Sequence, residues 1–238
     1  MSESHSSHEQ QPQDSNSGES SLLKASGVTG SMTLVSRVLG LARDVVIARV
    51  FGVGDGVDAF FVANKIPNFM RRLFAEGAFN QAFVPVLSEY RSTKTLADVQ
   101  LLINSVAGSL GGFLLIFTFV AVVAAPLIAV PIAYGFTDEP DKFALLVEML
   151  RITFPYLFLI SMTALCGSIL NSYARFAVPA VTPALLNLSF IICSFFLVPY
   201  MRVPELALAW AVLIAGVAQL LFQLPFLARM RLMPVPTV

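Results

Sequence analysis

The sequence predicts an all-α integral membrane protein with six transmembrane helices. Of its 238 residues, 56% are hydrophobic and 13% are charged, and the mean hydropathy is +0.76. Soluble domains average roughly 45–50% apolar and 25% charged residues, so a water-soluble core could not bury this much apolar surface. The apolar residues also occur in runs of about 20, the length that crosses a bilayer as a helix.

Six segments are long enough to span a membrane: residues 25–51, 57–90, 99–126, 143–171, 178–199 and 206–228. The last four are strongly apolar, whereas charged residues lower the hydropathy of the first two. As one straight helix of about 34 residues, the second would be about 50 Å long, against a hydrocarbon core of about 30 Å. Because it also contains Pro67, Gly77 and Pro85, we expect it to be tilted or broken, which favours a watery cavity beside it.

The charges in the segments between the predicted spans differ between the two sides of the membrane. Basic residues mark alternate ends, at Lys24, then Arg91 and Lys94, then Arg175, and then Arg229 and Arg231. The opposite loops hold Asp55, Asp58, Asp138, Glu139, Asp141 and Lys142, and Arg202 with Glu205. Since loops rich in Lys and Arg stay in the cytoplasm, the sequence predicts that both ends of this chain are cytoplasmic.

Residues 1–21 are rich in Ser, Glu and Gln, and we interpret them as a disordered, polar, cytoplasmic tail. His5 and His8 in this tail have no thiolate or carboxylate partner at ligand spacing, so no metal site is expected. Cys166 and Cys193 lie in apolar runs and are interpreted as packing residues. No cofactor is expected, and the zero net charge gives no reason to expect a nucleic-acid partner.

Ionisable residues inside the first predicted span are its most informative feature. Arg37 and Asp44 are seven residues apart and share one helical face, with Arg43 about 100° away. An arginine near the bilayer centre costs at least about 2.5 kcal/mol to insert, so it usually faces a cavity or pairs with another charge. Arg49, near the outer end, is interpreted as an interfacial anchor.

The second predicted span repeats the pattern. Asp58, Lys65 and Arg72 follow one another at seven-residue steps, Arg71 is adjacent, and Glu76 lies one turn further on. One interpretation is structural, with Arg72 and Glu76 forming an i, i+4 pair and the other charges neutralising one another. Across both spans, however, basic residues outnumber acidic ones, and the two sets are Arg37, Arg43, Arg49, Lys65, Arg71 and Arg72 against Asp44, Asp58 and Glu76.

A net cationic, partly desolvated pocket within a helical bundle suits phosphate or carboxylate groups, because guanidinium groups bind these anions with paired hydrogen bonds. Ser36 and Asn68 could add neutral hydrogen bonds, although contacts between helices are an equally good explanation for both. Asn104, Asn171 and Asn187 are interpreted as helix–helix contacts of that kind. From the residues alone, a multispan transporter with an anion-binding cavity is the prediction.

Several stretches closely resemble the MviN/MurJ family of bacterial lipid II flippases. They are residues 36–44 (SRVLGLARD), 58–63 (DAFFVA), 65–85 (KIPNFMRRLFAEGAFNQAFVP), 141–144 (DKFA), 152–156 (ITFPY) and 206–212 (LALAWAV). The resemblance covers residues 22 to about 230. It implies the multidrug/oligosaccharidyl-lipid/polysaccharide exporter superfamily, in which two six-helix lobes enclose a central cavity.

The resemblance also implies a function. Members of the family move the undecaprenyl-diphosphate-linked peptidoglycan precursor across the bacterial inner membrane. Positions matching Arg37, Arg43, Arg71, Asp58 and Asn68 are functionally important in them, so the three arginines are expected to hold the diphosphate and Asp58 to help gate the outer side. Family chains are about twice this length, so residues 22–233 are expected to be the N-terminal lobe and 234–238 the start of a linker to a second lobe.

The expected partners are lipid II, membrane lipids, the second lobe and the cell-wall synthesis machinery. Three alternatives remain open. The first is another transporter of the same superfamily, although a carrier of cationic drugs would need acidic residues in its cavity. The second is a membrane enzyme acting on polyprenyl phosphates, which would need an acid/base or metal cluster. The third is a regulatory half-transporter that no longer translocates its substrate.

Overall fold

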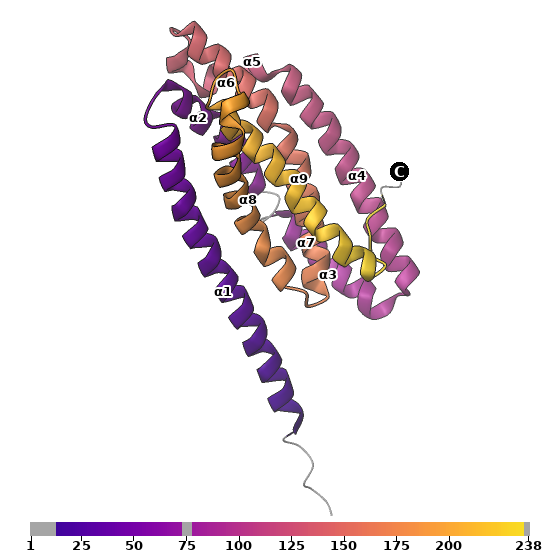
Figure 1. The fold of residues 1–238 in the computed structure, drawn as a ribbon. Helices are drawn as coiled ribbons and strands as arrows, with labels where there is room; N and C mark the ends of the chain where they lie inside the picture. Colours follow the sequence, from indigo (N-terminus) through magenta and orange to yellow (C-terminus); the bar gives the residue numbers. More distant parts are fainter. Residues whose placement is uncertain (1–12, 73–77, 236–238) are drawn as a thin grey trace, which may run out of the picture.

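The structure is a computed structural model that describes residues 13–72 and 78–235, and nearly all of these residues are helical. Figure 1 shows most of the helices lying side by side along one long axis. In chain order they are α1 (Gln13–Val50), α2 (Asp55–Arg71), α3 (Ala78–Thr93), α4 (Leu96–Val123), α5 (Ala125–Ile132), the 3-10 helix η2 (Tyr134–Phe136), α6 (Pro140–Thr153), α7 (Pro155–Ser172), α8 (Ala177–Phe196), the 3-10 helix η3 (Val198–Tyr200) and α9 (Leu206–Arg229).

Four helical segments of the described chain are long and apolar enough to cross a membrane. They are α4, α6 together with α7, α8, and α9, which correspond to the last four predicted spans. The all-α membrane fold is therefore confirmed. The first two predicted spans carry the ionisable residues and are not among the four, so the count of six spans stays a prediction.

The second predicted span contains two described helices, α2 and α3, on either side of residues 73–77. Helix α2 ends at Arg71 and α3 begins at Ala78, while residues 73–77 lie outside the described part of the chain. Pro67 and Pro85 lie inside α2 and α3. The choice between a tilted and a broken helix stays a prediction.

Three boundaries differ from the sequence prediction. Pro155 starts α7, so the predicted fourth span is two helices, because proline has no N–H to continue the ladder of α6. The third span likewise divides at Ala124, and Pro126 lies in the first turn of α5. Helix α1 begins at Gln13, so residues 13–21 of the predicted disordered tail are helical. The polar residues 13–21 can be helical because adding residues to an existing helix costs far less free energy than nucleating a new one.

The helices pack in a fixed order around α9. Helix α1 lies along α8, α8 along α9, α9 along α7, and α2 along α6. Small residues line the buried face of α9, and Ala207, Ala211, Ala215 and Gly216 are all buried there. Such residues let helix backbones approach closely, which is the main source of packing energy in a bilayer. The outward face of α4 is instead apolar and exposed, with Ile116 69% and Phe119 71% exposed.

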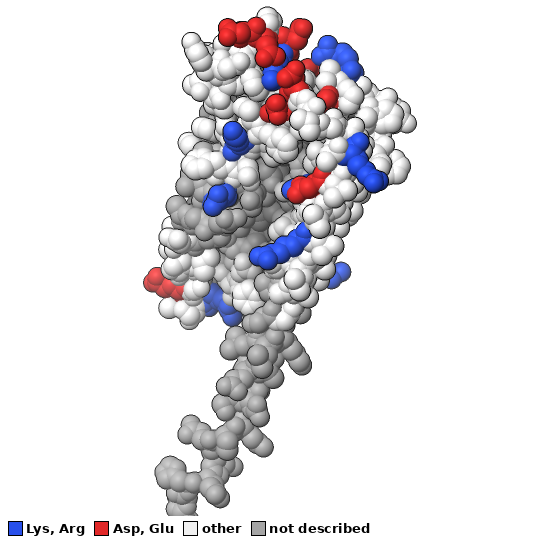
Figure 2. Space-filling view, turned by 90° about the vertical axis from the view of Figure 1, so that its left-hand side faces the viewer, with Lys and Arg blue, Asp and Glu red and all other residues white. Residues whose placement is uncertain are grey.

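One end of the bundle is rich in acidic side chains. Figure 2 shows acidic side chains gathered at one end of the described chain. Asp55, Asp138, Glu139, Asp141 and Glu148 line a cavity of about 740 Å³ there, together with Lys142 and Arg202. Ion pairs cross this end, because the Lys142 Nζ lies 2.6 Å from Asp55 and an Arg202 Nη lies 3.1 Å from Glu148. The loops assigned to one side from their charges therefore do share one end.

Candidate functional site

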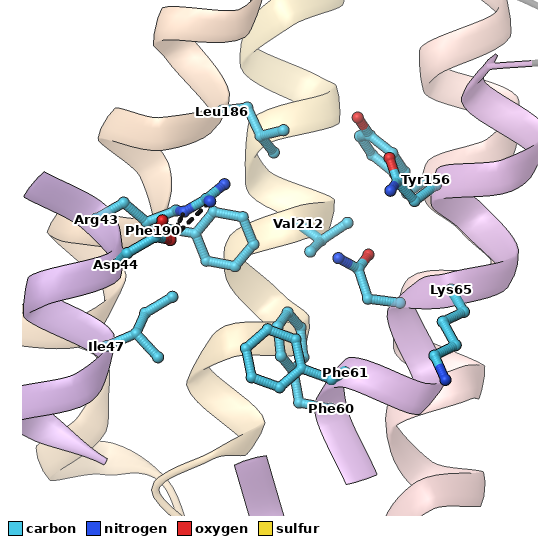
Figure 3. Close-up of a pocket in the computed structure, with 12 residues that line it drawn as sticks. Arg43, Asp44, Ile47, Phe60, Phe61, Lys65, Tyr156, Leu186, Phe190 and Val212 are labelled. Atoms are coloured by element: carbon cyan, nitrogen blue, oxygen red, sulfur yellow. Dashed lines mark hydrogen bonds and ion pairs between the residues drawn. The ribbon is translucent and has the colours of Figure 1, made fainter. Parts of the chain in front are cut away.

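A second cavity, of about 480 Å³, lies between α1 and α2 and has α7, α8 and α9 behind it (Figure 3). The charged side chains that line it come from α1 and α2, which contain the ionisable residues of the first two predicted spans. Aromatic and aliphatic residues form the rest of the wall. The lining residues are Arg43, Asp44, Ile47, Phe60, Phe61, Asn64, Lys65, Asn68, Tyr156, Leu186, Phe190 and Val212.

Arg43 is held on two sides at the α1 wall of the cavity. Its Nε and Nη2 donate to one carboxylate oxygen of Asp44, at 2.9 and 2.7 Å, and its Nη1 donates to Asn187 Oδ1 at 3.1 Å. The guanidinium carbon lies 5.6 Å from the centre of the Phe190 ring, within the range of a cation–π interaction. The side chain is only 29% exposed, so its charge is presented from a fixed, half-buried position.

The α2 wall contributes a polar stripe of its own. Asn64, Lys65 and Asn68 form this stripe, and with Phe61 they occupy positions i, i+3, i+4 and i+7 of one helical face, which lines the cavity. Phe60 lies beside them and is buried, and its ring meets Phe190 edge to face, with centroids 5.9 Å apart. This aromatic contact joins α2 to α8 behind the polar stripe.

The structure brings four of the predicted site residues into one cavity: Arg43, Asp44, Lys65 and Asn68. Two of these come from α1 and two from α2, helices separated by a loop in the sequence. Among the described lining residues, the charges of Arg43 and Lys65 exceed that of Asp44 by one. The described lining of the cavity is therefore net cationic by one charge, a smaller excess than that of the full set of charges in the two predicted spans.

The other predicted site residues lie elsewhere. Arg37 is exposed on α1, two turns before Asp44 on the same stripe. Ser36 meets α8 through its backbone carbonyl, which accepts from Asn187 at 3.0 Å. Arg72 is exposed at the C-terminal end of α2.

Asp58 lies near the acidic end of the bundle, where its charge acts on Lys142. The side chain of Arg71 and the whole of Glu76 lie outside the described part of the chain. The roles assigned to all of these residues stay predictions.

Sequence reasoning missed the partners that α7 and α8 supply. Asn187 was interpreted as a helix–helix contact, which is correct, but its contact is with the cavity arginine. Phe190 and Tyr156 gave no signal, since an aromatic residue in an apolar run is usually a packing residue. Only Asn187 could have been singled out, as a polar residue in the middle of an apolar helix.

These features define a class of protein. A bundle of long apolar helices that enclose a cavity lined by charged residues is the architecture of a multi-pass membrane protein. A family model for "Lipid II flippase MurJ" matches residues 47–238 of the chain. The chain belongs to this family.

Individual relatives support the same assignment. A probable lipid II flippase MurJ of Vibrio cholerae is 46% identical over 215 residues, which cover 87% of this chain and 41% of that protein. The lipid II flippase MurJ of Burkholderia cenocepacia is 42% identical over 214 residues, covering 90% and 42% of the two chains. The chain therefore spans about two fifths of the length of the curated relatives that it matches.

A solved structure agrees with the fold. The lipid II flippase MurJ in an inward closed conformation superposes with a TM-score of 0.67 at 30% sequence identity. The match covers 81% of this chain and 40% of that one. In both the curated relatives and the solved structure, the region that matches this chain is less than half of a longer protein.

Proposed function

We propose that this chain is the N-terminal lobe of a flippase that moves lipid II, an undecaprenyl-diphosphate-linked precursor of peptidoglycan, from the inner to the outer leaflet of the bacterial inner membrane. It acts as a transporter and not as an enzyme. A second lobe of the same protein closes the cavity, and the two lobes rock against each other so that the head group is exposed to alternate sides. The lipid tail remains in the bilayer throughout.

The observation that carries this proposal is the presentation of Arg43 at the wall of a half-open cavity. Its guanidinium is anchored on two sides and lies opposite Lys65 and Asn68 on α2. A diphosphate is expensive to move into a medium of low dielectric constant, and fixed cations lower that cost. The positive balance of the cavity also favours an anionic cargo over a cationic drug. Relatives that carry the name lipid II flippase support the choice of this particular anion.

The proposal predicts that the complete gene product will replace a missing lipid II flippase. It is expressed in cells depleted of their own flippase, with its membrane level matched to that of the protein it replaces. We expect growth to be restored and newly flipped lipid II to become accessible at the outer leaflet. If the protein is inserted and folded but neither effect appears, the assignment of lipid II as the substrate is wrong.

The proposal also fixes an orientation, with the acidic end of the bundle outside the cell. Thr137 is exposed at that end and Ser92 is exposed near the end of α3, so each can be replaced singly by cysteine. Labelling with a membrane-impermeant maleimide is expected for Thr137→Cys in intact cells, and for Ser92→Cys only after the inner membrane is opened. The native Cys166 and Cys193 are 1% and 4% exposed, so their background is low. The reverse pattern would invert the assigned topology.

A further inference from the structure

Asn187 links α8 to the cavity arginine. It lies in the middle of an apolar helix and is 7% exposed. Its Nδ2 donates to the carbonyl of Ser36 at 3.0 Å and its Oδ1 accepts from Arg43 at 3.1 Å. A buried amide without partners is costly in an apolar environment, so both groups of this side chain are bound to α1.

The orientation of the Asn187 amide follows from its two partners. A backbone carbonyl only accepts hydrogen bonds and a guanidinium only donates them. The NH₂ group must therefore face Ser36 and the oxygen must face Arg43. Gly40 lies between these two partners on α1, and a Cβ there would be 3.6 Å from the Asn187 Nδ2. The amide thus lies closely against α1 in a single orientation.

The bonds to Arg43 leave part of the guanidinium available. Among the described residues, Asp44 takes the Nε hydrogen and one Nη2 hydrogen, and Asn187 takes one Nη1 hydrogen. Since a guanidinium has five N–H donors, one hydrogen on each Nη remains for a ligand. Asp44 is the next residue on the same helix and its side chain is 62% exposed. Asn187 is the buried anchor, and it comes from another helix.

We propose that Asn187 is a positioning residue, which holds the Arg43 guanidinium at the cavity wall without neutralising its charge, so that it can bind the diphosphate of the substrate. This inference rests on the proposed function. A neutral amide suits the task because a carboxylate at the same place would add a second ion pair to the one with Asp44 and reduce the attraction of Arg43 for an anion. An aliphatic residue would leave the guanidinium hydrogen-bonded only to Asp44, which is exposed on the same helix.

Three variants of the complete gene product test this role: Asn187→Ala, Asn187→Asp and, as a matched control, Ser189→Ala. Ser189 is on the same helix and is also 7% exposed, but its hydroxyl donates to the carbonyl of Ala211 on α9. We expect Asn187→Ala and Asn187→Asp to reduce the rate of lipid II translocation in proteoliposomes roughly ten- to a hundredfold, the penalty typical of a misplaced binding group. Ser189→Ala should remain near the wild-type rate.

Inorganic pyrophosphate provides a second readout that does not depend on transport. It should raise the melting temperature of the purified wild-type protein, because a ligand that binds only the folded state stabilises it. Asn187→Ala and Asn187→Asp should lose most of this shift, and both should melt somewhat lower without pyrophosphate because neither side chain can donate to the Ser36 carbonyl. A purely structural role predicts the same lower melting temperature but an unchanged shift with pyrophosphate.

The outcomes separate the two proposals. Loss of the pyrophosphate shift in the Asn187 variants, without lipid II transport by the wild type, would support the positioning role and refute the substrate. Lipid II transport at the wild-type rate by Asn187→Ala and Asn187→Asp would refute the positioning role and leave the substrate standing. No pyrophosphate shift in the wild type, or an equal shift in Arg43→Ala, would also overturn the inference, since the anion would not be held by Arg43.

Discussion

Replacing Arg43 by alanine is expected to abolish rescue of flippase-depleted cells. The guanidinium can donate two further hydrogen bonds to the substrate, and hydrogen bonds to charged groups contribute about 1.5–3 kcal/mol each. Losing about 3 kcal/mol from the transport step would slow it roughly a hundredfold. The measurement is growth of the depleted cells, together with the initial rate of lipid II translocation in proteoliposomes that contain equal amounts of protein.

Two further variants make the Arg43 result specific. Arg43→Lys keeps the charge but loses the paired donors, so it should retain part of the activity. Arg49→Ala removes an exposed arginine from the last turn of the same helix and should behave as wild type. Undiminished rescue by Arg43→Ala, at matched membrane levels, would reduce Arg43 to a structural charge. The same experiment with Arg37→Ala and Arg71→Ala tests the other two predicted arginines.

Much of the fold was predictable because bilayer thickness sets a length that sequence runs must match. The helices α8 and α9 follow the predicted bounds within a few residues. A hydropathy window cannot detect that α6 and α7 are separate helices, because it averages apolarity along the sequence and does not register a change in the direction of the helix axis at Pro155.

The sequence predicted which residues share a face within one helix, but not which residues of different helices meet at the candidate site. Spacing at 100° per residue placed Lys65 on a stripe of charges but set Arg43 about 100° away from Asp44 around its helix, and the cavity contains all three residues. Spacing carries no information about which helix lies opposite, so the contact between Arg43 and Asn187, 144 residues apart in the sequence, left no local signal. Functional roles for Arg37 and Asp58 came from the family resemblance, and their positions in the fold do not by themselves assign those roles.

Replacing Gly216 by alanine is expected to destabilise the bundle more than a methyl group usually does. A Cβ at this position would lie 2.7 Å from the Cδ2 of the Tyr156 ring and 3.0 Å from the Cβ of Leu159. Neither atom is the free end of a flexible side chain, so α7 and α9 would have to separate. Overpacking of this kind typically costs about 1–3 kcal/mol.

The separation should also reach the cavity, because Tyr156 lines it from α7. We therefore expect Gly216→Ala to lower both the melting temperature in detergent and the rate of lipid II translocation. Gly112→Ala is the matched control, since a Cβ at Gly112 meets no atom within 4 Å. Alanine is also the better helix former by about 0.5–1 kcal/mol, so this control should be neutral or slightly stabilising. Equal melting temperatures for the two variants would mean that α7 and α9 are not in close contact at Gly216.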